Sequence, residues 1–549
     1  MRRFSRRDFL GSAAGIGAAA AGVGLTGSRR AEARIGSIAE YRKLVPELFE
    51  PIPLPPPHSR AVVIGSGFGG AVSALRLAEA GIETTVLERG QRWPNGRWRN
   101  IFTYEPSPDG RGFWQRRFVS LPIVGSSGVR SRVDRFDGVL DITEYPNIQV
   151  WRGACVGGGS VVFTGVMIQP PQEFFRMIFG DTVSFEEMNR IYYTRVRTKL
   201  DLSIMPDEIY NSGPFGHSRV WDQQVESAGY VSKRVDSIFN WAVVQEELDL
   251  RSRPSATIGM SNLGNSNGAK FDLNQNYLKE AEQTGYATIY PDQQVTDIER
   301  FGRYYRIWID KLNPSGHVID SYSITCDYLF LGAGSIGTSE LLVKAKAKDT
   351  IPGLNEEIGQ GWGTNGDTLV GRSFNPIEGL VQGSPCASLI RDVDGPVPTS
   401  FENWYAAGVP IDVGILGALG IGFDLTNRGS FVYEPTLDEV RLRWPRDGND
   451  AVVEAATRMN DRIAREGRPR SVPGVPPFLV PVWGGVTAHP LGGAVIGKAT
   501  DDHGRVKNQR RLYVMDGAVI PGTTGSVNPS LTIAALAERN IERILAEDF

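Results

Sequence analysis

The sequence predicts a mixed α/β fold with more than one domain, and two observations lead to that prediction. At 549 residues the chain is longer than a single hydrophobic core usually serves. Near residue 60 an apolar strand, a glycine-rich turn and a helical pattern follow one another, as they do in a parallel α/β unit. The hydrophobic share of 41% and the charged share of 22% are those of an ordinary folded protein, not of a disordered chain or a membrane bundle.

The first 33 residues are predicted to be an export signal and not part of this fold. Residues 5–10 (SRRDFL) are typical of a twin-arginine signal, an Ala/Gly-rich stretch follows at 11–27, and residues 31–33 (AEA) match a cleavage site. An uncleaved N-terminal anchor is the alternative, although the stretch is short and glycine-rich for a spanning helix. We therefore expect a secreted, periplasmic or cell-surface protein.

The clearest motif of the chain begins with a short apolar run. Residues 61–64 (AVVI) predict a buried parallel strand, and a GxGxxG pattern follows where a helix must begin. Its three glycines are Gly65, Gly67 and Gly70. Because they carry no side chain, they let the backbone turn tightly, let N–H groups approach a pyrophosphate and let the helix pack closely on the sheet. A fortuitous glycine turn is the alternative interpretation.

A second apolar strand completes this unit. Residues 84–87 form the strand, and Glu88 closes it at about the distance from the first glycine that dinucleotide sites use. At a strand end, its carboxylate can accept hydrogen bonds from an adenosine ribose. Strand, turn, helix, strand and acid agree, so the unit predicts a Rossmann-like domain that binds a dinucleotide.

Three later segments again join a strand-like run to a glycine turn. They are residues 151–164 (WRGACVGGGSVVFT), 328–338 (YLFLGAGSIGT) and 512–521 (LYVMDGAVIP), and each alone could be a plain tight turn. Together with the first motif they match a family. The chain resembles the glucose-methanol-choline (GMC) flavin oxidoreductases and, within them, the non-covalent cholesterol oxidases. The most specific matching pieces are residues 359–371, 489–493 (HPLGG), 498–506 and 526–533.

The resemblance covers most of residues 60–549 and implies FAD as the cofactor. No histidine lies near the glycine loop, so we expect the FAD to be non-covalent. The residues that the resemblance places against FAD are Gly157, Gly158, Gly159, Ser160, Asp516 and Gly517, with Val295 near the adenine. Two departures stand out, because Phe163 occupies a position where related sequences often have Asn, and Ala494 one where Cys is common. Phe163 could alter flavin tuning or oxygen access.

The implied fold is α/β at its core and α+β overall, with a discontinuous substrate-binding domain that contains a large β-sheet and helices. The FAD-binding domain is expected to comprise residues 58–92, 266–350 and 485–549. The substrate-binding domain is expected to comprise residues 93–265 and 351–484.

Oxidation of an alcohol needs an electron acceptor and a polar group at the hydroxyl oxygen. His489 is the candidate for that group, because an imidazole can accept or donate a proton near neutral pH. Asn528 precedes a proline and a predicted helix at residues 531–545, so its amide could clamp the same oxygen or cap the helix. The other four histidines lie in proline-rich, hydrophilic or turn-like sequence and are predicted to be surface residues.

Glu402 is the third candidate catalytic residue. The resemblance places it where cholesterol oxidases carry the glutamate that moves a ring proton after oxidation. Apolar neighbours would raise its pKa and suit it to that task. A solvated glutamate at the start of a loop is the alternative.

Apolar sequence indicates the substrate class. Residues 406–423 contain one charged residue, Asp412, and residues 93–136 are rich in aromatic side chains with basic neighbours. These segments suit an apolar pocket and a lid that meets a lipid surface transiently, or else they are domain core. A sugar substrate would instead need a pocket of hydrogen-bonding side chains.

Charge and cysteine content bear on other functions. The net charge of −3, without a basic tract beyond the N-terminus, argues against a nucleic-acid partner. Three cysteines, Cys155, Cys326 and Cys386, are too few for a disulfide framework and lack metal-ligand spacing, so we expect them to be buried and no metal to be bound.

The sequence therefore predicts a secreted FAD-dependent sterol oxidase. It would oxidise a 3β-hydroxyl with O₂ as acceptor, release H₂O₂ and then isomerise the ring double bond. An FAD-dependent dehydrogenase of another apolar alcohol, with a non-oxygen acceptor, is the alternative. A non-catalytic lipid binder that keeps FAD as structure is a third.

Overall fold

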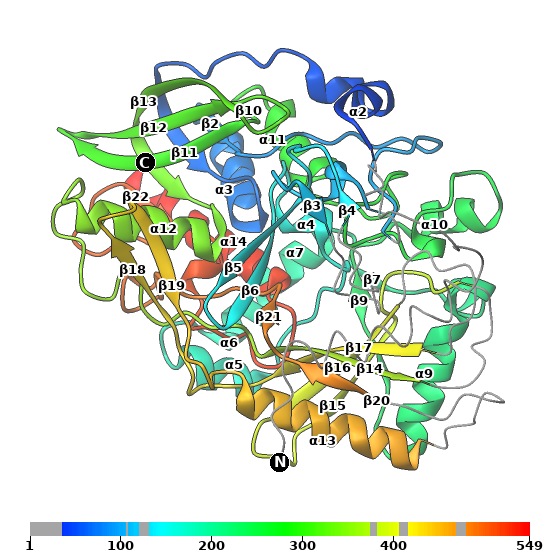
Figure 1. The fold of residues 1–549 in the computed structure, drawn as a ribbon. Coiled ribbons are helices and arrows are strands. Elements are labelled where there is room, and N and C mark those ends of the chain that lie inside the picture. The colour runs from blue at the N-terminus through cyan, green and yellow to red at the C-terminus, as the bar shows by residue number, and fades with distance from the viewer. Residues whose placement is uncertain (1–35, 106–107, 120–130, 374–380, 406–414, 468–478) are drawn as a thin grey trace.

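The computed structural model describes residues 36–105, 108–119, 131–373, 381–405, 415–467 and 479–549. The predicted export signal therefore lies outside the described residues, as do residues 406–414 of the predicted apolar stretch. Two large β-sheets, one mainly parallel and one antiparallel, organise the described part of the chain (Figure 1).

The first sheet has seven strands in the order β10-β2-β1-β13-β12-β11, with β22 paired to β13. These strands are β1 (His58–Ile64), β2 (Thr84–Leu87), β10 (Ala287–Tyr290), β11 (Gln293–Phe301), β12 (Tyr304–Leu312), β13 (Val318–Leu331) and β22 (Leu512–Val514). The long β13 pairs antiparallel with β12 and, toward its end, parallel with β1 and β22. The turns that follow the parallel strands consequently meet at one edge of the sheet, where such folds bind ligands.

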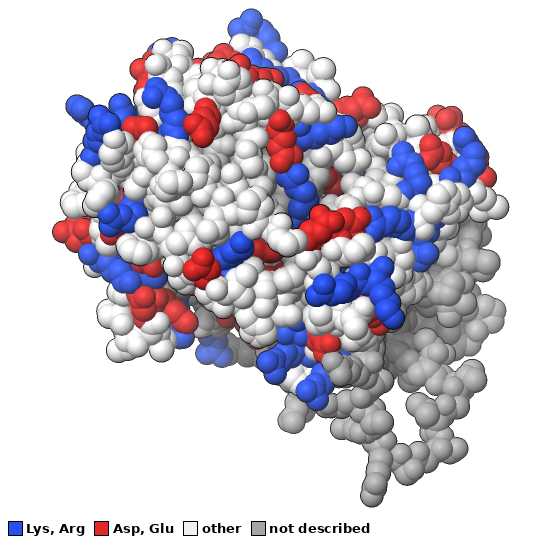
Figure 2. All heavy atoms as spheres, turned by 90° about the horizontal axis from the view of Figure 1, so that it is seen from above, with Lys and Arg blue, Asp and Glu red and all other residues white. Residues whose placement is uncertain are grey.

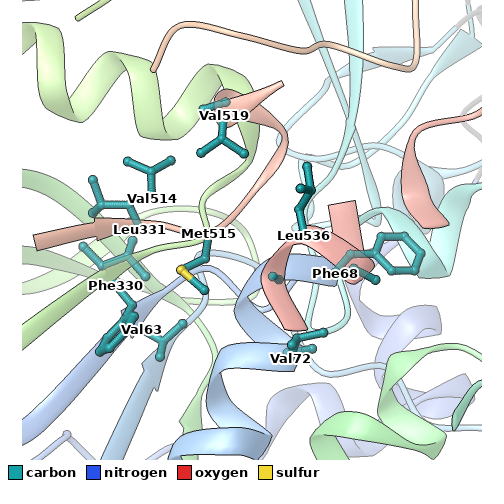
Figure 3. Close-up of a cluster of buried hydrophobic side chains, with 14 of the residues drawn as sticks. Val63, Phe68, Val72, Phe330, Leu331, Val514, Met515, Val519 and Leu536 are labelled. Atoms are coloured by element: carbon teal, nitrogen blue, oxygen red, sulfur yellow. The ribbon is translucent and has the colours of Figure 1, made fainter. Parts of the chain in front are cut away.

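Four helices pack around this sheet. Helix α3 (Phe68–Glu79) follows β1 and packs against α11 (Tyr277–Gln283) and α14 (Ser530–Asp548), whereas α12 (Gly334–Ala347) packs against β11. Figure 3 shows Val63, Val72, Phe330, Val514 and Leu536 together in one cluster that joins two of the helices to the sheet, and all five are essentially inaccessible to solvent. This cluster holds the glycine turn after β1 in a fixed place.

Two glycines of this region have no room for a side chain. A Cβ added at Gly69 would lie 1.8 Å from the carbonyl oxygen of Met515, and one added at Gly70 would lie 2.0 Å from that of Gly65. The helix can therefore approach the sheet this closely only with glycine at both positions.

The second sheet has six strands in the order β20-β14-β17-β16-β15-β8. They are β8 (Lys233–Arg234), β14 (Asp367–Ser373), β15 (Ser388–Asp392), β16 (Thr399–Trp404), β17 (Ile415–Gly422) and β20 (Leu479–Trp483). Helices α9 (Gly216–Ser227) and α13 (Asp450–Glu466) pack with Phe401 and Ala418 on one face of it. Because side chains alternate along a strand, Glu402 and Leu419 project from the opposite face.

The remaining elements form smaller sheets and connecting helices. The strands are β3 (Phe118–Val119), β4 (Ser131–Arg132), β5 (Leu140–Tyr145), β6 (Ile148–Gly153), β7 (Ser203–Ile204), β9 (Asp236–Ser237), β18 (Ser430–Glu434), β19 (Glu439–Arg443) and β21 (Val486–Thr487). The helices are α2 (Ile38–Leu44), α4 (Gly159–Val162), α5 (Gln172–Phe179), α6 (Phe185–Glu187), α7 (Tyr193–Lys199), α8 (Asp207–Tyr210) and α10 (Trp241–Leu248). Strands β21, β6 and β5 form a sheet of three.

The fold confirms several predicted elements and changes two interpretations. The predicted strands and the last helix are present, and the three cysteines are buried. The strands of the seven-stranded sheet all come from the segments predicted to bind FAD, although the domain limits themselves stay a prediction. His217, predicted at the surface, is instead fully buried, and burial lowers its pKa to about 3.

The aromatic segment at residues 93–136 is core in large part, which corrects the lid interpretation for its described residues. Trp93, Phe102 and Phe136 are buried in one cluster with Tyr41 of α2. No described helix is both long and apolar enough to cross a lipid bilayer. Figure 2 shows basic and acidic side chains interspersed over one face of the molecule.

Candidate active site

A cavity of about 880 Å³ lies between the sheets. Ile64 and Leu87 line it from the ends of two parallel strands, Leu369 and Leu419 line it from the six-stranded sheet, and Ile142 lines it from β5. The cavity therefore reaches from the glycine turn after β1 to the face of the antiparallel sheet that carries Leu419.

Most of the predicted site residues line this cavity. They are Gly65, Gly67, Glu88, Gly158, Gly159, Val295, His489, Asp516, Gly517 and Asn528. The cavity is not lined by the other four, which lie behind its lining residues: Gly70, Gly157, Ser160 and Glu402. Ser160 Oγ, for example, donates to the carbonyl of Gly157 at 2.7 Å and accepts from the N–H of Leu273 at 3.1 Å, so it holds the turn in shape.

One end of the cavity is bounded by backbone. A Cβ added at Gly67 or Gly159 would project into open space, and both residues line the cavity. Gly67 is the N-cap of α3, so the positive end of that helix faces the same space. These glycines form a cradle that side chains would fill, and the cradle fits the pyrophosphate of a dinucleotide.

Two buried carboxylates stand beside this cradle. Glu88 accepts from the N–H and hydroxyl of Ser66 at 3.1 and 2.7 Å and from the N–H of Gly90 at 3.1 Å. Burial raises the pKa of Glu88, and burial raises the pKa of Asp516 to about 6. Asp516 joins β22 to the start of α12, because it accepts from the N–H of Gly334 at 2.9 Å and from the Thr338 hydroxyl at 2.5 Å.

The other end of the cavity holds His489. Strand β21 leads directly to it, and Pro490 follows it in the cavity wall. Its Nδ1 lies 2.7 Å from Oδ1 of Asp367, the first residue of β14. The imidazole side chain is 12% exposed and Asp367 is 2% exposed. Although burial alone favours the neutral ring, the carboxylate of Asp367, aided by Glu402, raises the pKa of His489.

Asn528 and Glu402 form a second polar pair at this end. Asn528 Nδ2 donates to Glu402 Oε2 at 3.4 Å, and α14 has no side-chain cap, so the predicted capping role is not observed. Burial raises the pKa of Glu402 to about 7, although His489 and the bond from Asn528 favour its ionised form. Among the described residues, Glu402 Oε1 and Asn528 Oδ1 have no hydrogen-bond partner. Unpaired buried atoms of this kind call for an explanation, and a catalytic role, a water or an ion can supply one.

Comparisons with known proteins give a consistent set of matches. Residues 439–537 match the family described as GMC oxidoreductase, and residues 63–113 match the NAD(P)-binding Rossmann-like domain. The chain is 26% identical to a cholesterol oxidase of Mycobacterium tuberculosis, over 88% of this chain and 90% of that protein. It is 24% identical to a cholesterol oxidase of Acinetobacter baumannii, over 88% of this chain and 94% of that one. The chain is therefore similar to GMC oxidoreductases in its C-terminal part and to two cholesterol oxidases over most of its length.

Two solved oxidase structures share the fold. A pyridoxine 4-oxidase from Mesorbium loti aligns over 89% of this chain and 99% of its own, with a TM-score of 0.57 and 15% identity. A fungal aryl-alcohol oxidase aligns over 90% of this chain and 100% of its own, with a TM-score of 0.59 and 13% identity. These similarities support FAD as the cofactor and oxidation of an alcohol as the reaction, and the glycine cradle of this chain fits that cofactor.

The end of the cavity that holds His489 is walled mainly by apolar side chains. Leu369 and Leu419 lie opposite each other on β14 and β17, and Trp404, Val486 and Leu263 also line the cavity. No described residue of 93–136 lines it. The apolar wall therefore comes chiefly from the six-stranded sheet and its neighbours.

Two buried residues that hold parts of the site in place were missed from the sequence. Asp367 lies within a segment that carried the family resemblance, but nothing in its local sequence indicates a histidine partner 122 positions away. Lys270 is buried, and its Nζ donates to the carbonyls of Val161, Phe163 and Ser261 at 2.6, 2.8 and 2.6 Å. It therefore fixes the backbone of Phe163, whose side chain lines the cavity.

Proposed function

We propose that the protein is an exported FAD-dependent sterol oxidase. It converts the 3β-hydroxyl of a cholesterol-like steroid to a ketone, with O₂ as the acceptor and H₂O₂ as the second product. The observation that carries the proposal is the pairing of His489 with Asp367 at the apolar end of a cavity whose other end is a glycine cradle. The two cholesterol oxidases at 24–26% identity support the choice of a sterol.

Bound FAD would supply the acceptor for the hydride of the alcohol carbon. The chain has to take the hydroxyl proton. With Nδ1 engaged by Asp367, His489 has Nε2 left for the substrate hydroxyl, and the raised pKa makes it a stronger base. The Asn528 amide can orient the same oxygen, because Asn528 also lines this part of the cavity.

Glu402 is proposed to move the ring proton after oxidation. A carboxyl with a pKa of about 7 can take a proton from one carbon and return it to another near neutral pH. Glu402 is fully buried and bonded to Asn528 behind the cavity wall. Isomerisation therefore needs the Asn528 amide to release the carboxylate toward the steroid.

The apolar wall of the cavity favours a flat hydrocarbon as the ligand. Leu369, Leu419 and Trp404 can contact the steroid rings without leaving unpaired polar groups on the ligand. Non-covalent FAD, export by the twin-arginine signal and transient contact with a lipid surface complete the proposal.

A dehydrogenase of another apolar alcohol is the second candidate. Phe163 favours it, because its ring lines the cavity and contacts Phe68 edge-on at a centroid distance of 5.6 Å. A bulky side chain so close to the glycine turn could keep O₂ away from the flavin. The reduced flavin would then need a different electron acceptor.

Two parallel assays separate these functions. H₂O₂ and steroid ketone are measured with cholesterol in air, and reduction of an electron-accepting dye is measured with a panel of apolar alcohols. The oxidase proposal predicts equal amounts of H₂O₂ and ketone, with the 3α-epimer of cholesterol as the inactive control. Dye reduction without H₂O₂ would contradict the oxidase assignment, and activity only with non-steroid alcohols would contradict the sterol.

A further inference from the structure

We propose that Asp367 is a positioning residue that fixes the proton of His489 on Nδ1 and so makes Nε2 the base of the reaction. The inference rests on the proposed alcohol oxidation and assigns a function to a residue outside the predicted set of catalytic groups.

The contacts of Asp367 bind it to both the backbone and the side chain of the histidine segment. Its Oδ1 faces His489 Nδ1 at 2.7 Å, and its Oδ2 accepts from the N–H of Ala488 at 2.9 Å. The Thr487 hydroxyl lies 3.0 Å from the same Oδ2 and also accepts from the N–H of His489 at 2.9 Å. One carboxylate therefore orients the imidazole and the loop that carries it.

The chemistry of the pair determines the tautomer. An ionised carboxylate only accepts hydrogen bonds, so a nitrogen 2.7 Å away must carry a proton. Asp367 is almost completely buried, and water cannot replace this contact. Neutral His489 consequently has its lone pair on Nε2, as proton abstraction from an alcohol requires.

Two carboxyl groups influence the charge of this imidazole. Asp367 approaches it from β14 and Glu402 from β16, and both favour the protonated ring. The positive charge that His489 gains on taking the proton is thus balanced by a fixed neighbour. Asp367 makes the direct contact with the ring, whereas Glu402 is bonded to Asn528.

The substitution Asp367→Asn tests the proposal. Asparagine keeps the size of the side chain and an oxygen for the N–H of Ala488, but it presents an N–H to Nδ1 of His489. The imidazole then carries its proton on Nε2 and has no lone pair there to accept the proton of the hydroxyl. We expect the rate of flavin reduction by cholesterol to fall by about two to four orders of magnitude, with KM changed much less.

The deciding readout needs no substrate. The chain has five histidines, so ¹⁵N labelling of the imidazoles gives a small set of signals, and His489→Gln identifies the one of interest. In the wild-type holoenzyme we expect Nδ1–H and bare Nε2, and in Asp367→Asn the reverse. We also expect the pKa of His489 to fall by about one to three pH units in that variant, because an adjacent negative charge is lost.

Asp141→Asn is the matched control, because Asp141 is another buried aspartate, bonded to Arg89 and Arg152 and not to a histidine. It should leave the His489 signals unchanged. An unchanged tautomer and pKa in Asp367→Asn would overturn the proposal. A wild-type enzyme with the proton on Nε2 would also overturn it, even if the variant failed to fold. Failure of cholesterol to reduce the flavin would contradict the sterol oxidase alone, since the NMR result is independent of substrate.

Discussion

The two ends of the cavity differ in composition, because one is formed by backbone and the other by side chains. The cradle end consists of backbone that approaches other backbone, as at Gly69, where an added Cβ would lie 1.8 Å from a carbonyl oxygen. The catalytic end consists of side chains that meet from separate strands and loops, as His489 meets Asp367. The first end should therefore be sensitive to added volume, and the second to a change in protonation at constant volume.

His489→Ala should give an effect at least as large as that of Asp367→Asn, because it removes the only base proposed at the hydroxyl. We expect turnover with cholesterol to fall by about two to four orders of magnitude while the FAD content stays normal. Steady-state kinetics and the flavin absorbance of the purified variant measure the two quantities. Normal turnover would show that the catalytic end does not depend on this imidazole.

Glu402→Gln should separate the two proposed reactions. It keeps the volume and the bond from Asn528, so oxidation should stay within about tenfold, whereas isomerisation should fall at least about a hundredfold. In the wild type, isomerisation should increase as pH rises through about 7, since the carboxylate is the active form. Chromatography of the unconjugated and conjugated ketones measures both steps, and equal loss of both would contradict the division of roles.

A pair of glycine variants tests the cradle end. Gly69→Ala places its Cβ against the Met515 carbonyl and should destabilise even the apoprotein, by about 1–3 kcal/mol. Gly67→Ala places its Cβ in the open cavity, so the apoprotein should unfold at the wild-type temperature but bind FAD weakly. Thermal unfolding with and without FAD distinguishes the two, and identical behaviour of the pair would contradict the cradle.

The smallest effect is expected at the hairpin of β18 and β19. Asp438 lies at its turn, lines the cavity near Val295 and pairs with Lys344 at 3.4 Å and Lys348 at 2.7 Å. These ion pairs are partly exposed, so Asp438→Asn should speed FAD release only about two- to fivefold. The fluorescence of released FAD measures this rate, and Glu434→Gln, at the other side of the hairpin, is the control. In the wild type, added salt should produce a similar change.

The sequence was sufficient to predict the cradle end because its information is local. The apolar run at residues 61–64, the three glycines and Glu88 lie within one strand-turn-helix-strand unit, and the structure shows that unit. His489 and Asn528 also line the cavity, but the resemblance and not their local sequence pointed to them, and their catalytic roles stay a prediction.

The contacts of the catalytic end could not be predicted in the same way. Asp367 and His489 are brought together by the pairing of distant segments, and no periodicity encodes that contact. His217 shows the opposite error, because it lies in hydrophilic sequence and is nevertheless buried by the packing of α9. Trp93 and Phe102 suggested a lid by composition, but they fill a local core.

Anaerobic mixing of the purified holoenzyme with cholesterol is the decisive measurement for the proposed sterol oxidation. We expect the flavin absorbance to bleach, one steroid ketone to form per flavin, and the colour to return when air is admitted. A flavin that stays oxidised in the presence of cholesterol, in protein shown to be folded and loaded with FAD, would contradict it.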